Sequence, residues 1–125
     1  MTVLVDSDIL IEVSRGKNTG IVSAWIKLSS SDAAVLYSPV SVAALWAGAR
    51  PSEHDDLTNL FRALKCAPID EDVGLKGGVY MRQYGRSHGV EVADALIAAS
   101  AVASGAELWT RNRTHYPMKE VSFFD

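Results

Sequence analysis

The chain has 125 residues, of which 48% are hydrophobic and 22% are charged, a composition that excludes intrinsic disorder and suffices for one folded domain over residues 1–125. Its 12 basic and 15 acidic side chains give a formal net charge of −3, which argues against a broad electropositive surface for duplex nucleic acid. No apolar run is long enough to span a bilayer and no basic segment follows Met1, so we expect neither a membrane span nor a secretory signal.

The predicted elements alternate between strands and helices. Short β-branched or apolar runs predict strands, and apolar residues three or four positions apart predict helices. In chain order these are a strand at 2–5, helices at 9–13 and 20–28, a strand at 34–37, helices at 41–49, 53–64, 70–88 and 92–103, and strands at 107–110 and 121–124. We expect Pro39 to end the second strand and Ser41 to cap the next helix. This alternation predicts an α/β fold with a mainly parallel sheet covered on both faces.

Cys66 is the only cysteine, so the chain cannot form an internal disulfide. It lies close to the apolar residues Leu64 and Ala67 in the sequence. We therefore expect a reduced thiol packed in the core of a cytoplasmic protein, rather than a catalytic thiol.

Three polar groups lie where an open parallel sheet binds ligands, beyond the carboxyl ends of its strands. Asp6 ends the first strand, Asn112 follows the strand at 107–110, and Asp94 lies in the first turn of the helix at 92–103. Oxygen ligands of this kind suit Mg²⁺ or Mn²⁺, which can activate water for attack on a phosphodiester. Taken singly, each residue also has an ordinary role, as a helix cap, a partner of the helix dipole or a turn residue.

Four segments occur in a specific order and spacing over nearly the whole chain: LVDSDILI at 4–11, SVAALWAGAR at 41–50, ADALIAA at 93–99 and TRN at 110–112. Together they resemble the PIN-domain family and, more narrowly, the VapC-type toxins of bacterial toxin–antitoxin systems. The resemblance implies a three-layer α/β/α fold, dependence on Mg²⁺ or Mn²⁺, endonucleolytic cleavage of RNA and inhibition by a cognate antitoxin protein. Homodimers are common among such relatives. By position, the resemblance makes Asp6 and Asp94 the metal-binding acids and Asn112 the fourth polar residue of the catalytic site.

The second acid of the family, a Glu, falls on position 44, where this chain has Ala44. Either the acid has been lost naturally, or an original Glu has been replaced deliberately to silence a toxic nuclease. The intact residues around position 44 favour deliberate replacement. In both cases we expect weakened metal binding and little activity from this exact chain.

Other side chains could support such a site, although a solvated surface or the core is the ordinary place for each. Glu91 could share a helical face with Asp94, and His115 and Tyr116 could reach substrate from a surface turn. Candidates for phosphate contacts are Arg82, Arg86, Arg111 and Arg113. Candidates for an antitoxin groove are Ile9, Leu10, Val13, Trp25 and Trp46, at least half of which we expect in the core.

Two further classes of function stay open. One is a PIN-like module that binds RNA or an antitoxin without cutting. The other is a small α/β phosphatase, with Asp6 as nucleophile beside a partner acid and a lysine, or a nucleotide-binding domain. A nucleotide-binding domain would need a glycine-rich phosphate loop after the first strand, where the sequence instead has Asp6, Ser7 and Asp8.

Overall fold

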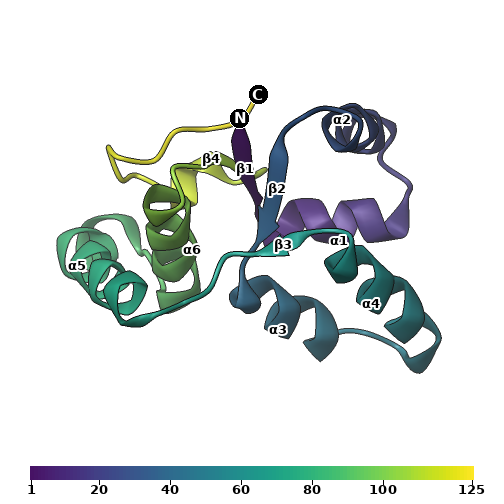
Figure 1. The fold of residues 1–125 in the computed structure, drawn as a ribbon. Helices are drawn as coiled ribbons and strands as arrows, with labels where there is room; N and C mark the ends of the chain where they lie inside the picture. Colours follow the sequence, from purple (N-terminus) through teal and green to yellow (C-terminus); the bar gives the residue numbers. More distant parts are fainter.

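The computed structural model describes residues 1–125 and has a short parallel sheet at its centre (Figure 1). The sheet has the order β3-β2-β1-β4, and all its pairings are parallel. The strands are β1 (Thr2–Val5), β2 (Ala34–Tyr37), β3 (Lys65–Cys66) and β4 (Glu107–Trp109). Val5 is paired with Trp109, so the first and last strands end at the same edge of the sheet.

Helices cover both faces of the sheet, as the alternating sequence pattern predicts. They are α1 (Ser7–Arg15), α2 (Thr19–Ser29), α3 (Pro39–Ala47), α4 (His54–Arg62), α5 (Glu71–His88) and α6 (Val92–Ala103). Two short 3-10 turns, η1 (Pro51–Glu53) and η2 (Arg113–His115), complete the chain. Figure 1 shows α5 and α6 on one side of the strands and α1 to α4 on the other, which is a three-layer α/β/α arrangement. None of the helices combines the length and apolar character that crossing a membrane requires.

The core forms two apolar layers because successive residues of a strand point to opposite faces of the sheet. On β1, Leu4 belongs to the layer beneath α5 and α6, whereas Val3 and Val5 belong to the layer beneath α1 to α4. The alanine-rich α6 packs closely on α5, where a Cβ added at Gly77 would lie 3.0 Å from Cδ2 of Leu96. This close packing fixes the start of α6 relative to the sheet.

Three expectations about local structure are wrong. Ser38, rather than Ser41, caps α3, since its Oγ accepts a hydrogen bond from the Val40 N–H at 3.1 Å. The helix begins two residues earlier than predicted because Pro39 suits the first helical position. Ser41 is fully buried instead, with its Oγ 2.8 Å from Oγ of Ser7. Cys66 is exposed, because it lies in the two-residue edge strand β3, which the sequence pattern did not reveal.

The C-terminal strand predicted at 121–124 is reduced to one parallel bridge between Leu108 and Phe123. The strand at 107–110 ends one residue early, at Trp109. Thr110 is thereby free to turn its hydroxyl toward the residues that follow β1.

Candidate functional site

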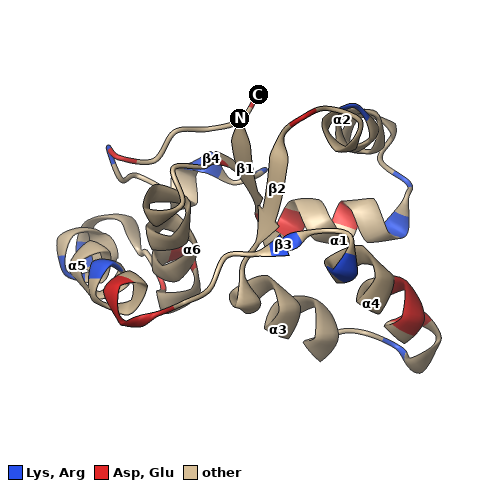
Figure 2. Cartoon of the chain, viewed as in Figure 1, with Lys and Arg blue, Asp and Glu red and all other residues tan.

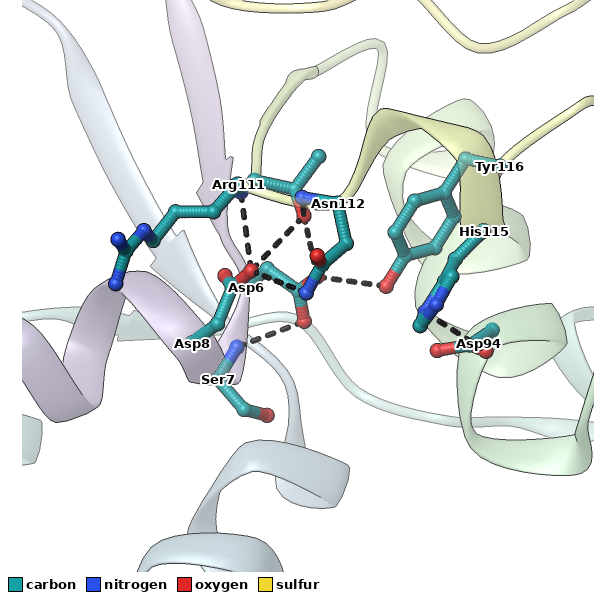
Figure 3. A network of polar contacts seen from close by, with 9 residues as sticks. Asp6, Ser7, Asp8, Asp94, Arg111, Asn112, His115 and Tyr116 are labelled. Carbon is teal, nitrogen blue, oxygen red and sulfur yellow. Dashed lines mark hydrogen bonds and ion pairs between the residues drawn. The ribbon is translucent and has the colours of Figure 1, made fainter.

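Asp6 lies at the carboxyl end of β1, buried to 7% exposure, where its backbone N–H donates to the Trp109 carbonyl at 2.9 Å. Its Oδ1 accepts a hydrogen bond from the Ser7 N–H at 2.7 Å. Its Oδ2 accepts from the Tyr116 hydroxyl at 2.7 Å and from the Thr110 hydroxyl at 2.8 Å (Figure 3). Three donors therefore hold this carboxylate in one orientation and offset the cost of burying its charge.

Tyr116 was expected on a surface turn, yet it is buried. Burial raises the pKa of its hydroxyl, and the charge of Asp6 and the hydrogen bond to Asp6 raise it further. The hydroxyl consequently keeps its proton at physiological pH and serves as a fixed donor to Asp6. A tyrosine four residues after Asn112 gave no sequence signal of this role, because only the η2 turn brings it back over β1.

Asp8 joins the start of α1 to the loop after β4. Its Oδ2 accepts hydrogen bonds from the Arg111 N–H at 3.0 Å, the Asn112 side-chain amide at 3.1 Å and the Thr110 hydroxyl at 3.4 Å. Its Oδ1 is buried without a hydrogen-bond partner. Burial raises the pKa of Asp8, and the nearby charge of Asp6 adds to that increase. The sequence indicated only a helix cap here, so the contribution of Asp8 to the site was missed.

Asp94 approaches from the first turn of α6, with 24% of its side chain exposed. Its Oδ2 lies 3.7 Å from Nδ1 of His115. Burial raises the pKa of Asp94; the charge of His115 lowers it in part, while the charges of Asp6 and Glu91 raise it. Asp6 and Asp94 are thus close enough to repel each other, and Figure 3 shows both on the same side of the loop that carries Tyr116.

The structure brings some of the predicted residues together and separates others. Asp6 and Asp94 converge, whereas the Asn112 amide is directed to Asp8. Ala44 is exposed on α3, one turn beyond Ser41, and borders a small cavity of about 110 Å³ between α1, α3 and α4. The position expected for the second acid therefore lies beside α1, but its alanine offers no metal ligand.

The remaining candidate residues differ in burial and in their distance from the site. Ile9 and Leu10 are buried in the core and Trp46 is 36% exposed. Val13 and Trp25 are partly buried against the same core, so core packing accounts for four of the five apolar candidates. Arg111 lies at the site, but Arg113 is bound to Asp125 at 2.6 Å. Arg82 and Arg86 project from α5, and Glu91 is an exposed residue at the start of α6.

Asp6 and Asp94 could hold a hard divalent cation, because Mg²⁺ usually binds one or two carboxylates and fills its other positions with water and phosphate oxygens. Two partly desolvated carboxylates that repel each other favour such a cation. No group of three histidine, cysteine or acidic side chains is arranged to hold a metal, so the residues fit a site of two carboxylates rather than a closed protein cage. The arrangement suits metal-assisted hydrolysis.

Comparisons with known proteins show the family and the fold of the chain. The family model described as PIN domain matches residues 3–121. Ribonuclease VapC10 of Mycobacterium tuberculosis is 36% identical over 121 residues, which cover 94% of this chain and 88% of that protein. The crystal structure of VapBC2 from Rickettsia felis bound to a promoter DNA fragment superposes with a TM-score of 0.83 at 17% identity, covering 99% of this chain and 98% of that one.

A toxin–antitoxin complex from Klebsiella pneumoniae superposes with a TM-score of 0.74 at 19% identity, covering 95% of this chain and 94% of that chain. At such identities the two superpositions show a common fold alone. The family match extends over nearly all residues and includes the acids at both ends of the site. The chain belongs to the PIN domain family.

Proposed function

We propose that this chain is the toxin of a type II toxin–antitoxin pair and that its site is built to hydrolyse RNA with Mg²⁺ or Mn²⁺. The observation that supports the proposal best is the convergence of Asp6 and Asp94, from the end of β1 and the start of α6. A 36% identity with a protein named Ribonuclease VapC10 supports the same substrate class.

The residues of this chain have distinct tasks in the proposed reaction. Asp6 presents a carboxylate whose orientation is fixed by Ser7, Thr110 and Tyr116. Asp94 supplies the facing carboxylate, and a divalent cation bound by the two would activate water and neutralise charge on the phosphodiester. Asn112 is a positioning residue here, since its amide holds the loop after β4 against Asp8.

Ala44 limits the reaction in this proposal because it removes one carboxylate from the site. The small cavity beside it and its exposure leave room for a longer side chain without strain on the core. Glutamate also has good helix propensity, so it can be introduced into α3 at little cost.

The test is RNA cleavage by the Ala44→Glu variant with Mg²⁺, compared with Ala44→Gln, which has the same size and no charge. We expect cleavage from Ala44→Glu alone, and its loss on adding Asp6→Asn. An Ala44→Glu protein that folds, binds Mg²⁺ and leaves RNA intact would contradict the nuclease function.

The absent acid also favours a second candidate, a PIN-like module that binds RNA or an antitoxin without cutting. Because Ala44 offers no ligand and the Asn112 amide donates to Asp8, the proposed metal site keeps only Asp6 and Asp94 of its four expected positions. The Ala44→Glu experiment separates the two, since a pure binding module gains no cleavage from one added carboxylate.

A protein antitoxin is the partner we propose for the apolar groove of about 570 Å³ between α2, α4 and the sheet edge, lined in part by Trp25, Val35, Leu60 and Leu64. The Rickettsia structure and the Klebsiella toxin–antitoxin complex described above support a partner of this kind.

A homodimer is a separate proposal, which is supported by the exposed apolar side chains of Leu75 and Val79 on α5. Co-purification with a partner and the mass of the purified protein in solution test the two proposals.

A further inference from the structure

Arginine and lysine side chains lie along α1, from the acidic site at the start of the helix to a polar pocket at its C-terminal end. Arg111 stands beside Asp8, to which its backbone N–H donates at 3.0 Å. Its guanidinium lies 3.7 Å from one oxygen of Glu12, and the guanidinium of Arg15 lies 3.7 Å from the other. Glu12 therefore spaces two arginines along the helix, and both keep half or more of their side-chain surface exposed.

The pocket at the end of this row has a volume of about 350 Å³ and no apolar lining residue. Its lining, which we call the α1–η1 pocket, consists of Arg15, Lys17, Gly48, Arg50, Ser52 and Glu53. Figure 2 shows basic positions at the two segments that border it, at the end of α1 and between α3 and α4. The pocket adjoins the cavity beside Ala44, since Arg15, Gly48 and Glu53 line both.

The charges of the α1–η1 pocket leave it open to an anion. Lys17 and Arg50 form no ion pair within the chain. The only acid of the lining, Glu53, already accepts a hydrogen bond from the Arg50 N–H at 3.0 Å. Three cations, the unpaired Lys17 and Arg50 and the Arg15 that pairs with Glu12, thus surround one polar hollow, in a chain whose net charge is −3.

We propose that the α1–η1 pocket binds the sugar-phosphate backbone of single-stranded RNA whose scissile bond lies at Asp6 and Asp94. The proposal rests on the ribonuclease function and adds where the rest of the substrate lies. Arginine and lysine bind phosphate by charge, and arginine can do so with two parallel hydrogen bonds. The nine residues of α1 span about 13 Å at 1.5 Å per residue, so the pocket engages phosphates beyond the one that is cut.

The polar lining favours a nucleic acid over a protein as occupant. A protein partner gains most of its affinity from buried aromatic and apolar anchors, and the pocket offers none. Phosphate contacts need only accessible cations, which Lys17 and Arg50 supply.

The test measures the binding of a labelled single-stranded RNA of mixed sequence by fluorescence anisotropy. The RNA is titrated with the full, unmodified chain in a buffer that contains Mg²⁺, at several salt concentrations. For the double variant Lys17→Gln/Arg50→Gln we expect the slope of log affinity against log salt to fall by about 1.4, because each lost phosphate contact contributes about 0.7 for single strands. If the two proteins bind equally at 1 M salt, this slope change corresponds to a loss of about 25-fold in affinity at 0.1 M.

The matched control is Arg62→Gln/Lys119→Gln, which removes one arginine and one lysine that are exposed, form no ion pair and lie outside the lining of the pocket. Equal losses in the two double variants would show a response to net charge and overturn the proposal. So would unchanged binding in the pocket variant, or no RNA binding by the parent chain. Polyglutamate that binds with the same dependence on Lys17 and Arg50 would instead assign the pocket to an acidic peptide.

The outcome is separable from that of the proposed function. If Ala44→Glu fails to cleave while the pocket variant loses RNA binding, the nuclease function fails and the RNA site stands. If Ala44→Glu cleaves and the pocket variant still binds RNA normally, the pocket proposal alone fails. Thermal unfolding of each variant checks that these exposed substitutions leave the fold intact.

Discussion

The hydroxyl of Tyr116 donates a 2.7 Å hydrogen bond to Oδ2 of Asp6, which lies 110 positions earlier in the chain. Both side chains are buried, and the hydrogen bond between them holds the C-terminal segment against the end of β1. Its removal leaves a buried carboxylate with one donor fewer.

We expect Tyr116→Phe to lower the free energy of unfolding by about 1.5–3 kcal/mol, the range for hydrogen bonds to charged groups. Urea denaturation at neutral pH measures this loss. The matched control is Tyr84→Phe, because the Tyr84 hydroxyl makes no hydrogen bond within the chain and its ring is partly buried in the same layer. Equal losses from the two substitutions would contradict the role given to the Tyr116 hydroxyl.

Asp94→Asn tests whether the two carboxylates bind a cation, with a measurement that does not depend on activity. Since burial and the charge of Asp6 disfavour ionised Asp94, we expect the variant to be as stable as the parent or more stable when divalent ions are absent. Added Mg²⁺ or Mn²⁺ should raise the Tm of the parent and leave that of Asp94→Asn unchanged. An equal rise in both proteins would place the cation elsewhere.

Asp8 is predicted to hold the loop after β4 in place. Asp8→Ala removes the acceptor shared by Thr110, Arg111 and Asn112, and we expect a loss of about 2 kcal/mol in the free energy of unfolding. We also expect faster hydrogen exchange at the backbone amide of Arg111, since the variant removes the only acceptor of that N–H. Unchanged exchange there would show that the loop is fixed by other contacts.

Glu120 gives a pH dependence of stability with a definite sign. Hydrogen bonds from Lys76 at 2.9 Å and Tyr80 at 3.0 Å lower the pKa of this carboxyl in the folded state. The unfolded chain therefore binds more protons just below the ordinary glutamate value, so stability rises with pH there. The contribution is present above the ordinary value of 4.5 and is lost as pH falls through the folded pKa. In Glu120→Gln this part of the pH dependence of Tm should disappear.

Gly77 and Gly78 form a matched pair on α5. A Cβ at Gly77 would lie 3.0 Å from Leu96, whereas a Cβ at Gly78 meets open space. Valine at either position has the same helix propensity, so the two variants differ mainly in packing. We expect Gly77→Val to be less stable than Gly78→Val by about 1–3 kcal/mol, the usual cost of overpacking. Equal stabilities in urea denaturation would show that α5 and α6 can separate freely.

The sequence predicted most of the fold because the helices and strands carry strong periodic patterns. The helices at 70–88 and 92–103 and the strands at 2–5 and 34–37 lie almost where they were expected. The edge strand Lys65–Cys66 was missed because two residues have no periodicity, and its position depends on pairing with β2. Contacts that are distant in the sequence set such an element.

The candidate site was predicted only in part, because some of its contacts also join residues that are distant in the sequence. Asp6 and Asp94 could be chosen from their places at the ends of a strand and a helix and from the resemblance of the segments around them. The roles of Asp8 and Tyr116 could not be predicted, since both arise from hydrogen bonds between residues more than 100 positions apart. Local sequence carries no record of such partners.

The two strands that frame the site come from opposite ends of the chain, and this order has a consequence during synthesis. A ribosome makes Asp6 more than 100 residues before Thr110 and Tyr116, which are two of its three donors. At a synthesis rate of about 5–20 residues per second, several seconds separate the first acid from the residues that orient it. The emerging chain therefore lacks an assembled site until residues 110–116 have been made, and the cell that makes it has that interval before any nuclease can act.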